Sequence, residues 1–379
     1  MRYIGNKTRL LHFITRVLRS RGIRGGTAVD PFCGTASVAR RLKRRGFRVV
    51  AADLMQYAYV FARAYVEVPG VPDVSPLCAR LGLRGRSLES ILGFLNRLPP
   101  EPGFIHEHYS PAGGAGRLHG RMYFTPENAA RIDAVRSFLE EWHVTGQSSD
   151  DLHHVLLAAL LEAADRVANT TGVYAAFVKS WQPNALRPLM LRSAGLIAGN
   201  GCRAVRADAL ELVQSLEPFD LLYLDPPYNN RQYAGYYHVP EVIATGWFAS
   251  APDTRGKTGL IHDADRRSDW SRTNQCEDAF ESLIASAPCR HIVMSYNDEG
   301  IIPESTIRRV LREHGRADTY RRHHTGYRRY RSDADSETRR YRGDRVREYL
   351  YCVEKGVSDG ARSRPEAPSP AEGRARRSA

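Results

Sequence analysis

Short apolar runs in the first and the later parts of the sequence predict buried β-strands. Residues Thr27 to Asp30 and Arg48 to Asp53 are two such runs, and a segment with helical spacing of apolar residues, Thr35 to Arg45, lies between them. Strand, loop, helix and strand in this order form the parallel unit of an α/β sheet. Four later runs predict further strands at residues 202–207, 219–224, 290–295 and 346–353.

The strand pattern stops between residues 54 and 170. This segment contains no run typical of a buried strand, whereas Asp151 to Asn169 carries one apolar face at helical spacing. We therefore predict an α/β fold in which a Rossmann-like sheet, residues 1–53 and 171–355, is interrupted by a mainly helical insertion, residues 54–170. Residues 356–379 are almost all small, proline or charged residues, a composition that predicts a disordered tail.

One motif with chemical potential is Asp225-Pro226-Pro227-Tyr228, which directly follows the predicted strand at 219–224. Ligands of open parallel sheets bind beyond the carboxyl ends of the strands. The Asp225 side chain and the Pro226 carbonyl can accept both hydrogens of an exocyclic amine, while Tyr228 stacks on a planar base. The alternative interpretation is an ordinary proline-rich turn capped by aspartate.

A second motif, Asp30-Pro31-Phe32-Cys33-Gly34-Thr35, ends the first predicted strand and begins a helix. Gly34 allows the backbone to approach a ligand closely. Asp53, at the end of the next strand, has the usual position of a carboxylate that binds ribose hydroxyls. The loop and Asp53 together predict an adenosine-containing cofactor, and the lack of a G-x-G-x-x-G pattern argues against a dinucleotide. The alternative is a tight turn between two strand-end carboxylates that bind nothing.

The N-terminus, Tyr3-Ile4-Gly5-Asn6-Lys7, precedes apolar residues at helical spacing. Lys7 could meet a carboxylate of a ligand, and Tyr3 could flank an aromatic ring. The alternative for Lys7 is a solvent-facing lysine ahead of a helix.

Taken in order along the chain, these motifs resemble the N6-adenine-specific DNA methyltransferases of the alpha class, bacterial adenine methylases that include restriction–modification enzymes. The similarity continues through Asn169 to Tyr174, Lys257 to Gly259 and Ser295 to Gly300, and it covers most of residues 1–355. Tyr3 departs from the pattern, because many relatives have tryptophan there. The resemblance implies a sheet that binds S-adenosylmethionine, with the helical insertion recognising the target sequence.

The resemblance also assigns roles to individual residues. It implies that Asp225, Pro226, Pro227 and Tyr228 are catalytic. It implies cofactor binding by Tyr3, Lys7, Asp30, Phe32, Gly34, Asp53, Asp208 and Asp225.

The activity implied by the resemblance is methyl transfer to N6 of a flipped-out adenine in double-stranded DNA, by the modification enzyme of a restriction–modification system. A restriction endonuclease acting on the same site is the expected functional partner, without a stable complex. The alternatives left open are methylation of cytosine N4 in DNA or adenine N6 in RNA, and a catalytically inactive cofactor- and DNA-binding subunit.

The charge balance agrees with a nucleic-acid partner. The chain has 55 Lys and Arg against 42 Asp and Glu, a net charge of +13. Residues 316–347 contain eleven arginines and four tyrosines, a composition that suits contacts with phosphates and bases. The alternative is a plain solvated charge run, and the flipped-base activity implied by the resemblance favours DNA contact. In the insertion, the candidate DNA contacts are Arg117, His119, Arg121 and Tyr123, each with the alternative of a solvated loop residue.

The remaining sequence features predict a cytoplasmic protein, and we expect it to be a monomer. No apolar run is long enough to span a bilayer, and the N-terminus has no apolar signal region. The six cysteines are scattered without a C-x-x-C pair, as expected for free thiols. The pairs His153-His154 and His323-His324 lack partners at metal-ligand spacing, so we expect no metal.

Overall fold

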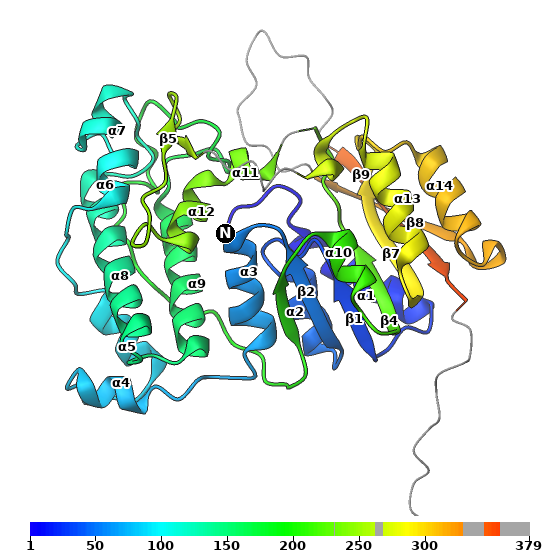
Figure 1. Cartoon of the computed structure of the whole chain (residues 1–379), viewed down its shortest axis with the longest axis horizontal. Helices are drawn as coiled ribbons and strands as arrows, with labels where there is room; N and C mark the ends of the chain where they lie inside the picture. Colours follow the sequence, from blue (N-terminus) through cyan, green and yellow to red (C-terminus); the bar gives the residue numbers. More distant parts are fainter. Residues whose placement is uncertain (231, 262–267, 329–344, 357–379) are drawn as a thin grey trace, which may run out of the picture.

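The computed structural model describes residues 1–230, 232–261, 268–328 and 345–356. At its centre lies a seven-stranded sheet (Figure 1), formed by β1 (Thr27–Asp30), β2 (Arg48–Asp53), β3 (Arg203–Arg206), β4 (Phe219–Leu224), β7 (Cys289–Asn297), β8 (Arg321–Arg328) and β9 (Arg345–Glu354). The strands lie in the order β3-β2-β1-β4-β7-β9-β8. The first five in this order are parallel, β9 is antiparallel to β7, and β8 is antiparallel to β9. The predicted α/β fold with a Rossmann-like sheet is confirmed.

All six predicted strands are present, and β8 is the strand of this sheet that the sequence did not predict. Helices cover both faces of the sheet, so most strands are buried on both sides and read as continuous apolar runs. In β4, Leu221 and Tyr223 face one core, and Leu222 and Leu224 face the other. Strand β8 lies at the edge of the sheet, and its exposed arginines form no apolar run.

Two sets of helices form the outer layers. The core that contains Leu221 is shared with α1 (Leu11–Ser20), α2 (Ser37–Arg44) and α3 (Gln56–Ala62). The opposite core is shared with α10 (Ala209–Gln214), α13 (Cys276–Ser286) and α14 (Glu304–Glu313). Short 3-10 helices, η1 (Lys7–Leu10), η4 (Asp269–Ser271) and η5 (Ala317–Thr319), complete this part.

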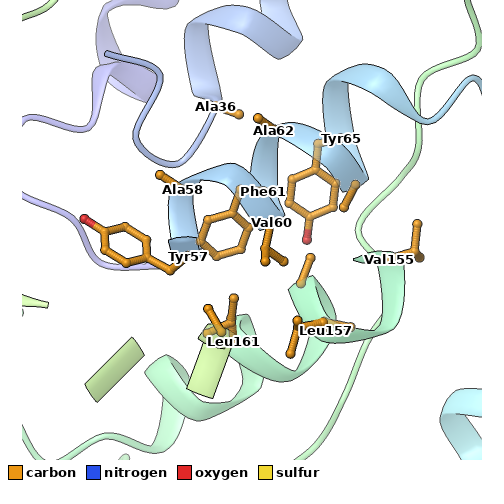
Figure 2. Packing of buried hydrophobic residues seen from close by; sticks show 14 of the residues in the cluster. Ala36, Tyr57, Ala58, Val60, Phe61, Ala62, Tyr65, Val155, Leu157 and Leu161 are labelled. Carbon is orange, nitrogen blue, oxygen red and sulfur yellow. The ribbon is translucent and has the colours of Figure 1, made fainter. Parts of the chain in front are cut away.

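Every regular element within residues 54–170 is helical, as the apolar pattern predicts. After α3 come the π-helix η2 (Arg63–Glu67), α4 (Ser75–Arg80), α5 (Leu88–Leu95), α6 (Phe104–Tyr109), α7 (Gly114–Leu118), α8 (Pro126–Val144) and α9 (Asp150–Val167). Figure 2 shows side chains of α3, including Val60 and Phe61, directed toward α9 with its Leu157 and Leu161. Because α3 also packs against β2 and β3, the helices and the sheet share one core. The domain boundaries at residues 54 and 170 stay a prediction.

The chain after β4 returns to the helical part through α11 (Tyr233–Tyr236), α12 (His238–Thr245) and a short hairpin of β5 (Thr254–Arg255) and β6 (Leu260–Ile261). Residues 329–344, the centre of the predicted basic region, and 357–379, nearly all of the predicted tail, lie outside the described residues. None of the described helices is both long and apolar enough to cross a membrane. All six cysteines are buried and free.

Two polar contacts position the segments that carry the motifs. The buried Glu241 carboxylate of α12 accepts hydrogen bonds from the backbone N–H groups of Gln56, at 2.9 Å, and Tyr57, at 3.1 Å. These donors begin α3 and would otherwise lack an intrahelical partner. At the N-terminus, the Arg2 guanidinium donates to the carbonyls of residues 165, 168 and 170 near the end of α9. The two contacts tie the segments around the strand ends to the helices.

Substitution of Glu241 by alanine should destabilise the protein. Two buried N–H groups would lose their acceptor, which costs about 2–3 kcal/mol in the free energy of unfolding. Urea denaturation measures this change. The matched control is Glu313→Ala, which removes an exposed carboxylate paired with Arg309 and should change stability by less than about 0.5 kcal/mol. Equal effects of the two substitutions would contradict the capping role of Glu241.

Candidate active site

A cavity lies at the carboxyl ends of the parallel strands, where the strand order reverses between β1 and β4. This switch point is the usual ligand site of an open α/β sheet. The cavity contains about 880 Å³ of space, part of it open to solvent. Its lining includes all eight residues predicted to bind a cofactor, namely Tyr3, Lys7, Asp30, Phe32, Gly34, Asp53, Asp208 and Asp225. Of the predicted catalytic residues, Asp225, Pro227 and Tyr228 line the cavity, whereas Pro226 is buried beside them.

The cavity is acidic. Asp30 and Asp53 end β1 and β2, and Asp208 and Asp225 follow β3 and β4, so one aspartate stands at the carboxyl end of each of four neighbouring strands. Lys7 is the only lysine or arginine among the lining residues that the structure describes. Such a charge pattern favours a positively charged ligand and disfavours a pyrophosphate.

Asp30 is the most deeply buried of these aspartates. Its Oδ1 atom has no hydrogen-bond partner among the described residues. Burial raises the pKa of Asp30 well above its usual range, and the charge of Asp225 adds to this rise. A buried oxygen atom without a hydrogen-bond partner costs folding free energy. Because this one faces the cavity, a hydrogen-bond donor on a bound ligand can supply the missing partner.

The loop after β1 depends on Gly34. Its φ of +51° is left-handed, and a Cβ atom there would lie 2.8 Å from a ring carbon of Tyr3. The Gly34 N–H donates to Asp53 Oδ2 at 3.0 Å, and the Met55 N–H donates to Oδ1 at 3.0 Å. Burial raises the pKa of Asp53 to about 6, against the effect of these backbone donors. A carboxylate has about four acceptor sites, so Asp53 can still accept hydrogen bonds from ligand hydroxyls.

Asp208 also has a structural role in the cavity wall. It caps α10, since its Oδ1 atom accepts a hydrogen bond from the Leu210 N–H at 2.8 Å.

Aromatic rings hold the two residues predicted to flank the cofactor. The Tyr3 ring stacks on Tyr237 with centroids 4.7 Å apart, and Phe32 meets Trp270 edge-on at 4.8 Å. Neither Tyr237 nor Trp270 was predicted from the sequence to have a role in the site. The tyrosine-rich run at 233–237 was a visible signal for the first, whereas Trp270 stands in a segment without any motif.

The motif predicted to be catalytic, Asp225 to Tyr228, takes part in a buried charge network. Asp225 Oδ1 lies 3.1 Å from the Lys7 Nζ atom and accepts a hydrogen bond from the Tyr228 hydroxyl. Lys7 also donates to Tyr228 and, at 2.7 Å, to Glu348 Oε1. Lys7 is 2% exposed, so the alternative of a solvent-facing lysine is wrong.

Burial raises the pKa of Asp225 to about 7; Lys7 opposes the rise and Glu348 adds to it. Glu348 could not be found from the sequence, because it stands beside Arg347 in the run at 346–353 and nothing there indicates its distant partner.

A sequence model of the D12 class N6 adenine-specific DNA methyltransferases matches residues 3–310, which include every segment that lines the cavity. The chain belongs to this family. The match confirms the resemblance indicated by the motifs, and with it an adenine-specific DNA methyltransferase activity.

The chain is also similar in sequence to individual DNA methyltransferases. It is 36% identical over 364 residues to the type II methyltransferase M.NlaIII of Neisseria lactamica, covering 94% of this chain and 99% of M.NlaIII. It is 33% identical over 366 residues to the type II methyltransferase M.FokI of Planomicrobium okeanokoites, covering 94% of this chain and 53% of M.FokI. It is 32% identical over 319 residues to the modification methylase StsI of Streptococcus sanguinis, covering 83% of this chain and 46% of StsI. The methyltransferase thus spans about half the length of the last two.

Two of the predicted DNA contacts are wrong, because Arg121 and Tyr123 are buried. The Arg121 guanidinium donates to the carbonyls of His108, Gly256 and Lys257 at 2.7–3.1 Å. The Tyr123 hydroxyl donates to the carbonyls of residues 174 and 258. Both side chains hold the turn between β5 and β6 instead of facing solvent.

The other predicted DNA contacts remain predictions. Arg117 is exposed and His119 is half-buried. In the basic region, the exposed arginines among the described residues are Arg316, Arg321, Arg322 and Arg347.

The structure contains one group of described residues with metal-like spacing, Glu281, Glu313 and His314. Arg309 pairs with both carboxylates, at 2.8 and 3.0 Å, so the group is an ion-pair cluster, and none of its members lines the cavity. Of the paired histidines, His153 is buried, and its Nδ1 atom lies 3.2 Å from the Leu139 carbonyl oxygen. That the enzyme needs no metal stays a prediction.

Replacing Gly34 with alanine should strain the loop after β1. A left-handed conformation costs a non-glycine residue about 1–2 kcal/mol, and the Tyr3 ring would also have to move. We expect the free energy of unfolding, measured by urea titration, to fall by about 2 kcal/mol. Gly25→Ala is the control, since a Cβ atom there meets nothing within 4 Å and the backbone is not left-handed. If both variants were equally stable, the close approach at Gly34 would be refuted.

Proposed function

We propose that this methyltransferase uses S-adenosylmethionine to methylate N6 of an adenine flipped out of double-stranded DNA, as the modification enzyme of a restriction–modification system. The observation that carries the proposal is the meeting of an acidic cavity with the Asp225 to Tyr228 motif at one edge of the sheet. The cavity suits a cation that carries an adenosine group, and the motif suits an amine.

The residues of the cavity fit S-adenosylmethionine. Asp30 offers an unpaired buried oxygen, Asp53 retains acceptor sites for ribose hydroxyls, and Gly34 leaves room that a Cβ atom would fill. Tyr3 and Phe32 contribute rings to the same wall. When bound, the cofactor supplies a methyl group that its sulfonium already activates. The protein therefore mainly has to bind and orient the two reactants.

The catalytic motif acts on the amine. The N6 lone pair of adenine is delocalised into the ring, which makes the amine a poor nucleophile. Hydrogen bonds from the amine to the Asp225 carboxylate and the Pro226 carbonyl would favour a tetrahedral nitrogen and free the lone pair. No covalent enzyme intermediate is required. Because Asp225 has a pKa of about 7, its accepting, ionised form becomes scarce as the pH falls below that value.

The target base has to leave the duplex, because an amine within the stack is out of reach. Extrusion costs a few kcal/mol, and stacking on Tyr228 would offset part of this cost. The helical segment at 54–170 and the exposed arginines of the β8–β9 region are the proposed DNA-binding elements.

The biological setting is also a proposal. The relatives described above are named type II methyltransferases and a modification methylase, which supports a role in restriction–modification. A restriction endonuclease of the same specificity is the proposed functional partner. Because one chain supplies both the cavity and the catalytic motif, we propose a monomer, acting in the cytoplasm where genomic DNA lies.

Methyl transfer by purified Asp225→Ala tests the catalytic assignment. Loss of the acceptor should reduce transfer from labelled S-adenosylmethionine to duplex DNA by about 100-fold or more. Cofactor binding, measured by calorimetry, should persist. The control is Asp278→Ala, an exposed aspartate of α13, which should keep wild-type activity.

The wild-type product decides between the alternatives. N6-methyladenine in DNA is expected from nucleoside analysis. N4-methylcytosine, or label in RNA alone, would contradict the proposal, and no transfer to any DNA would support an inactive subunit.

A further inference from the structure

Glu348 is a buried carboxylate next to the catalytic motif, and it lies beyond residues 3–310 that match the family. Its exposed fraction is 0%, and that of its partner Lys7 is 2%. A buried charge of this kind is costly unless it is paired. Here the pairing is with Lys7, the only ammonium in the described cavity lining, which has two carboxylate partners, Asp225 and Glu348.

The position of Glu348 is fixed by the sheet. Strand β9 lies between β7 and β8, and Glu348 is paired with Asn297 on one side and Thr325 on the other. The Ser295 hydroxyl of β7 donates to Glu348 Oε1 at 2.6 Å, the same atom that accepts from Lys7. Two backbone ladders and one side chain thus hold this oxygen in place.

Lys7, in contrast, lies in the N-terminal segment at the beginning of η1. Its long side chain has several rotatable bonds, so a single partner would define its position poorly. With Glu348 at 2.7 Å and Asp225 at 3.1 Å, the ammonium is held from two sides. A charge-assisted hydrogen bond is about twice as strong as a neutral one, so the charge of Glu348 contributes directly to this placement.

We propose that Glu348 is a positioning residue, which holds the Lys7 ammonium against Asp225 and thereby fixes the orientation of the catalytic carboxylate toward the target amine. This inference rests on the proposed function of Asp225. Glu348 does not touch the substrate; it acts through Lys7.

Glu348→Gln tests the inference, because the amide keeps the size of the side chain and removes its charge. Misplacement of a catalytic group by a fraction of an ångström should lower kcat by about tenfold or more. The KM values for S-adenosylmethionine and for duplex DNA should stay within about twofold, since the lost effect concerns the transition state. Glu354→Gln is the matched control on the same strand, where the carboxylate pairs with Arg21 near the surface, and it should leave kcat unchanged.

The two interpretations of Glu348 give different results. A merely structural carboxylate would lower the melting temperature or the amount of folded protein without lowering kcat per folded molecule, and that result would overturn the proposal. A fall in kcat with unchanged KM values and an unchanged melting temperature would support it.

If Glu348→Gln does not fold, Ser295→Ala carries the test, because it removes the other donor to Glu348 Oε1. A reduced kcat with unchanged KM values would support the positioning role, and a wild-type kcat would overturn it. The wild-type product separates this test from the proposed function. If the product were N4-methylcytosine, the proposed function would fail, while the ratio of kcat values would still decide the role of Glu348.

Discussion

Parallel strands bring their carboxyl ends to one edge of a sheet, and this arrangement governs the active site. An aspartate stands at that end of each of the strands β1 to β4, and burial makes four neighbouring carboxylates mutually unfavourable. The site therefore depends on positive charge brought in from elsewhere. Among the described lining residues, Lys7 alone provides a cationic side chain, and Arg2 anchors the segment that carries it to carbonyls near the end of α9.

The elements that could be predicted from the sequence are those whose pattern is local. Strand β4, which Asp225 directly follows, is buried on both faces, so its apolar run and the motif after it are visible together in the sequence. Strand β8 could not be predicted in this way, because an exposed edge strand does not require a run of apolar residues. Arg121 stands in a glycine-rich stretch, where the sequence suggests a solvent-exposed arginine that contacts DNA. Its hydrogen-bond acceptors include carbonyl groups 135 and 136 residues away in the sequence. Glu348 and Lys7 are separated by 341 residues, a pairing that only the folded sheet brings together.

The distribution of charge separates two tasks within one molecule. The chain as a whole carries +13, as expected for a protein that binds a polyanion, whereas the cavity concentrates carboxylates. A cationic cofactor and a DNA backbone are thereby attracted to different places. Asp225 lines this cavity, and in the proposed reaction it would face both the methyl donor and the amine of the target base. The Lys7 and Glu348 side chains beside Asp225 are buried, so their charges are largely shielded from water.

Site-specific methylation of adenine N6 is the central claim, and sequencing DNA from cells that express the protein, with detection of modified bases, tests it most directly. The account predicts N6-methyladenine at one position of a single short recognition sequence, at nearly every copy of that sequence. The account would be contradicted by modified cytosine, or by unmodified DNA from cells that express the active protein.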